Sequence, residues 1–456
     1  MPLLPMTTRW RPLRILTGLV ALLALLSSLE AGGRQNHGNE INPGNAGPAS
    51  SVEEATPDCG VPAPSADPVH QRAVHLAQLG VQRWHDAGYR GKGVKIAILD
   101  TGFHGYRGYL GKGLPAEVQT HCCRSDGNLE ARESMHGVLC AEVLHAIAPE
   151  AQVLLATWEP DSYEHFLEAA RWARSQGARI ISCSVIMPSW SDSEGNGPVH
   201  EALKRIVGSG EGKEDLVCFA SAGNTARRHW SGPFREGDNH FQEWQPGSTE
   251  NAVWPWGSDR VSVELCCPPG SRYRLEVDDA TAGSVVGQSN TPAEASRCCA
   301  VVRFNPTSGH RYHVRVQLLQ GPAKPFHLVA LGGDLKYATH QGSIPFPGDG
   351  AEVVAVGAVD AAGQRAPYSS CGPNSPCPKP DLVAPVPFPS WCRDRPFTGT
   401  SAAAPQAAGI AALCWARHPD WTAEQIRDAL RRWARDLGPP GHDWETGYGM
   451  VMLPEP

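Results

Sequence analysis

The sequence predicts an α/β fold, a doubly wound and mostly parallel sheet into which a sandwich-like all-β domain is inserted. Between residues 94 and 220, apolar runs of strand length alternate with helical runs over short connections, which is typical of a parallel sheet covered by helices. Between residues 232 and 338 the pattern changes to period-two runs separated by turns rich in Gly, Pro, Asn and Asp, which indicates antiparallel strands. The β unit therefore divides one α/β domain into residues 70–231 and 339–456.

Residues 1–31 are typical of a secretory signal peptide, because three arginines precede an apolar run at 15–26 and small residues follow it. The run is short for a membrane span, and an uncleaved anchor is the alternative. We therefore expect a secreted or periplasmic protein with no membrane span after signal removal. Residues 32–69 are rich in Gly, Pro, Asn and Ser without periodicity, which predicts a flexible linker.

The overall composition is that of an ordinary globular protein, with 41% apolar and 19% charged residues among 456. The formal net charge of −7 offers no electrostatic reason to bind nucleic acid. We expect no such partner.

The 14 cysteines fit an oxidising compartment. Four of them lie inside apolar strand or helix patterns and are expected to be free, namely Cys140, Cys183, Cys218 and Cys414. Ten lie in polar or turn-rich surroundings and are the better disulfide candidates, namely Cys59, Cys122, Cys123, Cys266, Cys267, Cys298, Cys299, Cys371, Cys377 and Cys392. One or two bridges between the pairs 266–267 and 298–299 would staple the insert. A zinc site is the competing interpretation, but no Cys-x-x-Cys spacing supports it.

The first part of the α/β domain opens with helical spacing over His70–Ala87 and a buried strand over Val94–Leu99. That strand ends in Asp100-Thr101-Gly102, and open α/β sheets place their sites at the carboxyl ends of strands. His136 opens an apolar helix that Pro149 helps to stop. The alternation continues with a strand at 152–156, a helix at 162–176, a strand at 179–184, a helix at 199–207 and a strand at 216–220.

The insert is expected to contain strands at 261–265, 273–277, 301–304, 312–318 and 326–330. Three tryptophans near its start, Trp244, Trp254 and Trp256, suggest an aromatic platform for a carbohydrate or protein partner. The other interpretation is a place in the core, where aromatic side chains of a β domain more often lie.

After the insert, residues 353–359 are expected to form a strand. Gly399-Thr400-Ser401 leads into an Ala-rich run as far as Leu413, which predicts a helix buried on all sides. Thr422 and Gln425 form a capping-box pattern that opens a last helix, ending near Leu437.

Three segments of the α/β domain carry an acid, an imidazole and a hydroxyl at strand or helix ends: Asp100, His136 and Ser401. Each alone has an ordinary structural explanation, as a turn Asp, a helix-terminal His or a capping Ser. Together, in the chain order Asp, His, Ser, they match the order found in subtilisin.

The sequence accordingly resembles the subtilase (subtilisin-like, S8) family of serine peptidases. The resemblance rests on the stretches 94–102, 136–137, 222–224, 368–370, 379–385 and 399–405. It implies a subtilisin-like sheet and catalytic roles for Asp100 as orienter, His136 as base and Ser401 as nucleophile. Asn224 would donate its side-chain amide to the oxyanion. The substrate, a protein or peptide, would lie along Ser184, Val185 and Ile186 and along Ser221, Ala222 and Gly223.

The chain departs from the family pattern where relatives read Ser-Leu-Gly, because here Ser184 is followed by Val185, Ile186, Met187 and Pro188. These residues are expected to narrow the substrate cleft. The helix after His136 lacks the loop insertion that carries calcium in many relatives, so we predict no metal and no cofactor. The alternative function is a catalytically weak binding or surface protein that holds a partner with its insert.

Overall fold

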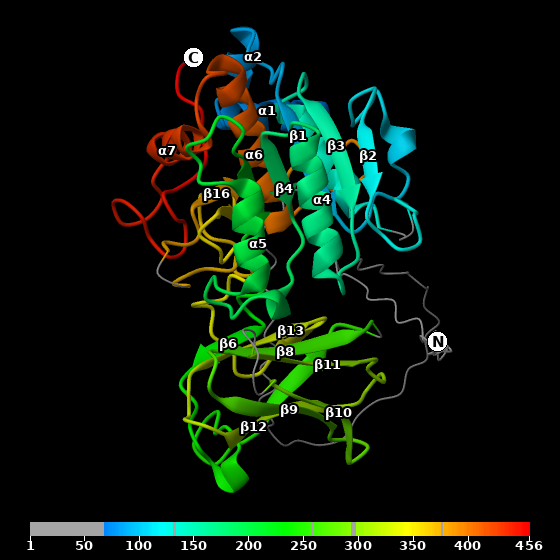
Figure 1. Ribbon diagram of the computed structural model, residues 1–456, viewed down its shortest axis with the longest axis vertical. Coiled ribbons are helices and arrows are strands. Elements are labelled where there is room, and N and C mark those ends of the chain that lie inside the picture. Colours follow the sequence, from blue (N-terminus) through cyan, green and yellow to red (C-terminus); the bar gives the residue numbers. More distant parts are fainter. Residues whose placement is uncertain (1–67, 131–133, 258, 293–297, 375–376) are drawn as a thin grey trace, which may run out of the picture.

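The computed structural model describes residues 68–130, 134–257, 259–292, 298–374 and 377–456 (Figure 1). The predicted signal peptide and nearly all of the predicted linker lie outside these residues. Within the described ranges, no helix is both long enough and apolar enough to cross a membrane.

The α/β domain is built on a seven-stranded sheet in the order β16-β15-β5-β4-β1-β3-β2, and every neighbouring pair of strands is parallel. The predicted fold class is thereby confirmed. The strands are β1 (Lys95–Asp100), β2 (Gln119–Cys122), β3 (Gln152–Thr157), β4 (Ile180–Cys183), β5 (Val217–Ser221), β15 (Val353–Val359) and β16 (Leu382–Pro385).

Helices cover both faces of this sheet (Figure 1). Alternate residues of β1 face opposite ways, as a strand requires: Ile96 and Ile98 join one core cluster, and Ala97 and Leu99 join the other. The second cluster contains α4 (Tyr163–Ser175) and α5 (Pro198–Val207). The first contains α1 (Pro68–Gln78), α2 (Val81–Asp86), α3 (His136–Ile147), α6 (Thr400–Arg417) and α7 (Ala423–Trp433).

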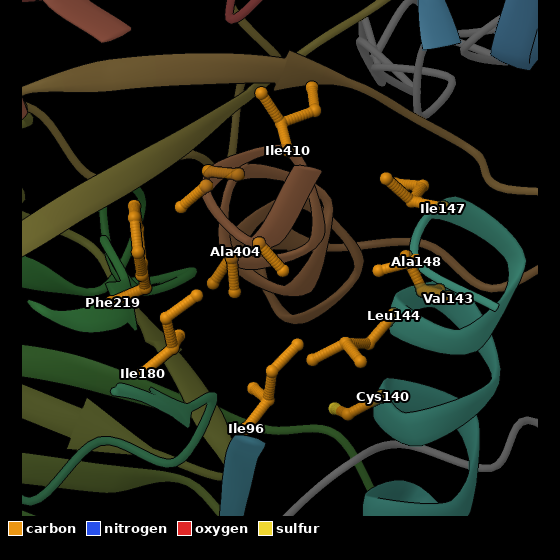
Figure 2. Packing of buried hydrophobic residues seen from close by; sticks show 14 of the residues in the cluster. Ile96, Cys140, Val143, Leu144, Ile147, Ala148, Ile180, Phe219, Ala404 and Ile410 are labelled. Atoms are coloured by element: carbon orange, nitrogen blue, oxygen red, sulfur yellow. The ribbon is translucent and has the colours of Figure 1, made fainter. Parts of the chain in front are cut away.

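Helix α6 lies at the centre of the first cluster, with strand residues such as Ile96, Ile180 and Phe219 on one side and α3 on the other (Figure 2). Its residues from Thr400 to Trp415 are all buried. Small side chains allow this, since a Cβ added to Gly409 would lie 2.8 Å from Cγ2 of Ile147. The predicted helix buried on all sides is confirmed.

The insert consists of two antiparallel sheets packed face to face, in the orders β10-β9-β12-β7-β14 and β11-β8-β13-β6. The sandwich-like prediction is confirmed. The strands are β6 (His229–Gly232), β7 (Asn251–Pro255), β8 (Val261–Cys267), β9 (Arg272–Asp279), β10 (Ser284–Asn290), β11 (Cys298–Phe304), β12 (Tyr312–Gln320), β13 (Phe326–Leu331) and β14 (Gly333–Leu335). Of these, β6, β7, β10 and β14 were not predicted. The chain also forms short 3-10 turns η1 (Tyr106–Tyr109), η2 (Pro188–Trp190) and η3 (Asp238–His240).

Two helix predictions were wrong in extent. The single helix expected over His70–Ala87 is divided into α1 and α2 at Gly80, whose φ of 77° is left-handed and where a Cβ would lie 2.5 Å from the carbonyl oxygen of Leu453. The helix opened by Thr422 has the predicted capping box, but it ends at Trp433. The chain turns at Ala434 because Arg435 pairs with Met450 through two backbone hydrogen bonds.

The tryptophans of the insert differ in burial, which distinguishes a position in the core from a place on the surface. Trp244 belongs to the sandwich core, whereas Trp254 and Trp256 are 55% and 46% exposed. The core interpretation therefore holds for Trp244, and a platform that contains all three rings is not formed. Cys266 and Cys299 are free thiols, and they lie directly opposite each other in the β8–β11 pair.

Candidate active site

Asp100 and His136 form a buried pair at the carboxyl end of β1. Nδ1 of His136 lies 2.7 Å from Oδ2 of Asp100. The other carboxylate oxygen accepts hydrogen bonds from the backbone N–H of Thr101 (2.8 Å) and Gly102 (3.2 Å). These bonds fix the carboxylate, which in turn fixes the imidazole. Nε2 of His136 is left buried and has no hydrogen-bond partner among the described residues.

Glycines allow the strand that carries Asp100 to approach the helix that carries His136. The N–H of Gly137 donates to the carbonyl of Gly102 at 2.8 Å. A Cβ on Gly137 would lie 2.5 Å from Cε1 of Phe103 and 2.7 Å from that carbonyl oxygen. Any larger residue would push α3 away from β1 and separate the pair.

Ser401 is the second residue of α6, directly after the N-cap Gly399 and Thr400. Its side chain is nearly buried, and its Oγ donates to the carbonyl oxygen of Ser184 at 3.3 Å. No hydrogen bond joins Ser401 Oγ to Nε2 of His136 in the described part of the chain. Such bonds often form only when substrate is present. To form one, the Ser401 hydroxyl would give up only its long hydrogen bond to the carbonyl of Ser184.

Pro405 explains how the start of α6 is held in place. A helix normally satisfies the carbonyl of residue i with the N–H of residue i+4, but proline has no N–H. The carbonyl of Ser401 accepts instead from the hydroxyl of Ser184 at 3.2 Å and from the thiol of Cys140 at 3.7 Å. The freed carbonyl thus ties the helix start to the end of β4 and to α3.

Asn224 follows β5 and is oriented by Thr400. Its Oδ1 accepts from the backbone N–H of Thr400 (3.0 Å) and from the hydroxyl of Thr400 (2.9 Å). Nδ2 forms no hydrogen bond with any described residue. Gly399, with φ of 86°, leaves room for this amide, since a Cβ there would lie 3.0 Å from Nδ2. The amide N–H groups therefore remain available beside the N-terminus of α6.

A cavity of about 90 Å³ lies next to Ser401 and Asn224, several times the space that one water molecule needs. The predicted substrate-binding residues Ser184, Val185, Ile186, Ser221 and Gly223 line it. Ala222 does not, because it is buried in the sheet and its N–H donates to the carbonyl of Val356.

Sequence reasoning missed the opposite wall of this cavity, which comes from the insert. The lining residues that were not predicted are Pro160, Arg228, Arg260, Ser262, Glu264, Arg303, Leu331 and Thr400, whereas Met187 belongs to the segment that was expected to narrow the cleft. Of these residues, only Arg228 could have been suspected from the sequence, because it lies four residues after the predicted oxyanion residue Asn224. Ser262, Glu264, Arg303 and Leu331 lie on the insert strands β8, β11 and β13, whereas Pro160 and Thr400 belong to the α/β domain.

The sheet β11-β8-β13-β6 packs against the segment that follows Ile186. Oε2 of Glu264 accepts from the N–H of Ser189 at 2.9 Å, and the thiol of Cys266 donates to the carbonyl of Pro188 at 3.7 Å. His327 pairs with Glu194 at 2.9 Å. This sheet is the one nearest the α/β domain in Figure 1. The insert therefore contacts and supports the segment that follows Ile186.

Among the residues that the structure describes, two groups of side chains are close enough to share a metal ion: Asp100, His136 and Cys140, and His121, Cys123 and Glu168. A cysteine ligand must lose its proton to bind a metal. Burial raises the pKa of Cys123 to about 12 and that of Cys140 well above its usual range. A metal would therefore have to displace a firmly held thiol proton at either place.

The chain matches the profile of the subtilase family over residues 91–263 and 280–449, and it belongs to that family. It is 34% identical over 111 residues to subtilisin from Bacillus pumilus, a match covering 24% of this chain and 39% of that protein. It is 38% identical over 117 residues to alkaline elastase YaB from Bacillus sp. (strain YaB), covering 24% of this chain and 28% of that protein. These matches thus span well under half of the length of the relatives.

The fold is similar to that of the CspB protease of Clostridium perfringens. The two structures superpose with a TM-score of 0.60 at 16% sequence identity, and the match covers 84% of this chain and 97% of that one. At this identity the similarity concerns the fold.

Proposed function

We propose that the protein is a serine endopeptidase that hydrolyses proteins or peptides through Ser401, His136 and Asp100. The observation that carries the proposal is the buried Asp100–His136 pair, whose Nε2 has no partner among the described residues, in a domain whose helix α6 presents Ser401. Membership of the subtilase family supports the same reaction class.

In this proposal His136 Nε2 takes the Ser401 proton as Oγ attacks the scissile carbonyl carbon. Asp100 holds the imidazole and stabilises its charged form. The oxyanion accepts hydrogen bonds from Nδ2 of Asn224 and from the N–H of Ser401, which as a first-turn group has no partner inside the helix. The imidazolium then protonates the leaving amine, and water, activated by the same base, releases the acyl group.

The second candidate is a catalytically weak binding protein on the same fold, and the residues Val185 to Pro188, which are expected to narrow the cleft, favour it. Both are tested by incubating the purified chain with a library of unstructured peptides and identifying products by mass spectrometry. We expect internal cleavages that prior fluorophosphonate treatment abolishes. A folded protein that cleaves nothing would favour the binding protein.

Replacing Asn224 by alanine is expected to lower kcat by about 10²- to 10³-fold, because one oxyanion donor is lost. KM should change much less, since the ground-state carbonyl needs this donor less. The measurement is steady-state kinetics normalised to fluorophosphonate-titrated sites. Asn128→Ala, at an exposed position remote from the cavity, is the control. Equal kcat values for the two variants would contradict the role of Asn224 as an oxyanion donor.

We also propose that the chain acts outside the cytoplasm and that Cys266 and Cys299 become joined there. They are directly opposite each other on β8 and β11. A disulfide between them would raise the free energy of unfolding by about 3–4 kcal/mol, because it reduces the entropy of the unfolded chain. Non-reducing peptide mapping of protein secreted into an oxidising compartment is expected to find this link. Free thiols at both positions would contradict it.

A further inference from the structure

The cavity beside Ser401 has a positively charged wall. Three arginines line it: Arg228 just before β6, Arg260 just before β8, and Arg303 on β11. Glu264 is the one carboxylate in its lining. This carboxylate is already occupied, because its oxygens accept from the N–H of Ser189 (2.9 Å) and from the hydroxyl of Ser262 (3.0 Å).

Arg228 is a buried cation with weak compensation. Its Nε donates to the carbonyl of Asn224 at 2.8 Å, and its guanidinium lies 4.5 Å from the ring centroid of Trp256. No carboxylate of the described residues lies within ion-pair distance of it. Burial lowers the pKa of Arg228 to about 10, and the more distant charge of Asp334 only partly opposes this. A buried charge without an ionic partner is costly unless a ligand supplies one.

Arg260 and Arg303 reinforce the same charge from the insert side. Burial and the neighbouring charge of Arg303 lower the pKa of Arg260, and the charge of Asp161 opposes them only in part. Nε of Arg303 is buried and has no hydrogen-bond partner among the residues that the structure describes. Like charges gathered around a small cavity are destabilising when it is empty. An anion inside would offset the repulsion between these guanidinium groups and supply the counter-charge that Arg228 lacks, and a guanidinium can hold a carboxylate in bidentate fashion.

We propose that this cavity selects substrates with an acidic side chain at the residue whose carbonyl Ser401 attacks. The inference rests on the proposed peptidase function, because it places that side chain in the cavity bounded by Ser401 and Asn224. The insert then acts as a specificity-determining part of the active site, since it supplies Arg260 and Arg303. An aspartate or glutamate is the substrate residue that this arrangement recognises.

The first measurement is independent of turnover. Peptides that differ only in Glu or Gln at the acyl-side position are titrated into the Ser401→Ala variant of the full chain. We expect the Glu peptide to bind about 10- to 100-fold more tightly, the usual worth of a hydrogen bond to a charged group. Equal binding, or tighter binding of Gln, would overturn the proposal. A wild-type protein without peptidase activity that still prefers Glu would refute the proposed function and leave acid recognition standing.

The second measurement locates the preference. Arg228 is buried and its replacement can unfold the chain, so the partly exposed Arg260 and Arg303 are replaced by glutamine. We expect each change to weaken binding of the Glu peptide several-fold while leaving the Gln peptide unchanged. Arg311→Gln, at an exposed position of the insert that does not line the cavity, should change neither. Loss of Glu binding in Arg311→Gln, or full preference in the double Arg260/Arg303 variant, would contradict the assignment.

Discussion

Replacing Ser401 by alanine is expected to lower kcat by about 10⁶-fold, because a triad loses nearly all of its cooperative contribution when its nucleophile is removed. The fold should persist, since among the described residues the Ser401 hydroxyl makes one hydrogen bond, to the carbonyl of Ser184 at 3.3 Å. Steady-state hydrolysis of a quenched peptide and a thermal unfolding curve measure the two quantities. Ser175→Ala, at an exposed position near the end of α4, is the control.

The same chemistry fixes the expected loss at Asp100. Asp100→Asn removes the carboxylate that lies 2.7 Å from Nδ1 of His136, and an asparagine favours the wrong imidazole tautomer. The expected loss in kcat is about 10⁴-fold. A decrease of less than tenfold in either the Ser401 or the Asp100 variant would contradict the assignment of these residues to one triad.

The second large effect concerns stability and arises from a buried cluster on α5. Nδ1 of His200 lies 2.7 Å from Oε1 of Glu352, and its Nε2 lies 3.0 Å from Oδ1 of Asp349. Asp349 also accepts from the hydroxyl of Ser191 and the N–H of Gly195. The cluster therefore connects α5 to the loop that contains Ser191 and Gly195. His200→Ala leaves two buried carboxylates without their cation, and we expect it to lower the free energy of unfolding by about 3–5 kcal/mol.

The loss should depend on pH in a defined direction. Burial opposes the charged imidazole, but the charge of Asp349 and hydrogen bonds to both carboxylates outweigh it and raise the pKa of His200 to about 10. A group whose pKa is raised on folding contributes fully below its unfolded value, about 6.5, and loses the contribution as pH rises through its folded value. The difference between wild type and His200→Ala should thus be largest near pH 6 and shrink towards pH 10.

Denaturant unfolding of both proteins at pH 6, 8 and 9.5 measures this difference. Glu201→Ala, at the exposed neighbouring position on α5, is the control and should change the free energy of unfolding by no more than about 0.5 kcal/mol at any pH. A His200→Ala effect that grows with pH would mean that the imidazole is neutral in the folded protein.

The sequence alone supported the parallel sheet because most of its strands are short, largely apolar and buried runs, as in β1 and β15. Strand β2, whose sequence is Gln-Thr-His-Cys and whose side chains are exposed or half-buried, was not predicted. The sequence also located Asp100, His136 and Ser401, since strand ends and helix starts are visible as changes in pattern. It did not predict β10, which lies at the edge of its sheet and carries mostly exposed side chains. Such a strand has no apolar alternation to detect.

The second wall of the cavity was beyond sequence reasoning for a different reason. The two-residue alternation of the sequence indicates that alternate side chains of β8 and of β11 share a face of the sheet, but it does not indicate what covers that face. Glu264 and Arg303 look like solvent-facing residues in the sequence, yet β8 is buried at all seven positions because the α/β domain lies against it. The hydrogen bond from Ser189 to Glu264 exists only once two distant parts of the chain have packed together.

The central claim, that Ser401 is a nucleophile activated by His136, is tested most directly by mapping a covalent adduct. The folded wild-type protein is treated with a fluorophosphonate and digested, and the modified peptide is identified by mass. We predict one adduct, on Ser401, and its loss in His136→Ala, which removes the base while keeping the serine. A folded wild-type protein that carries no adduct, or carries it on another residue, would contradict the account.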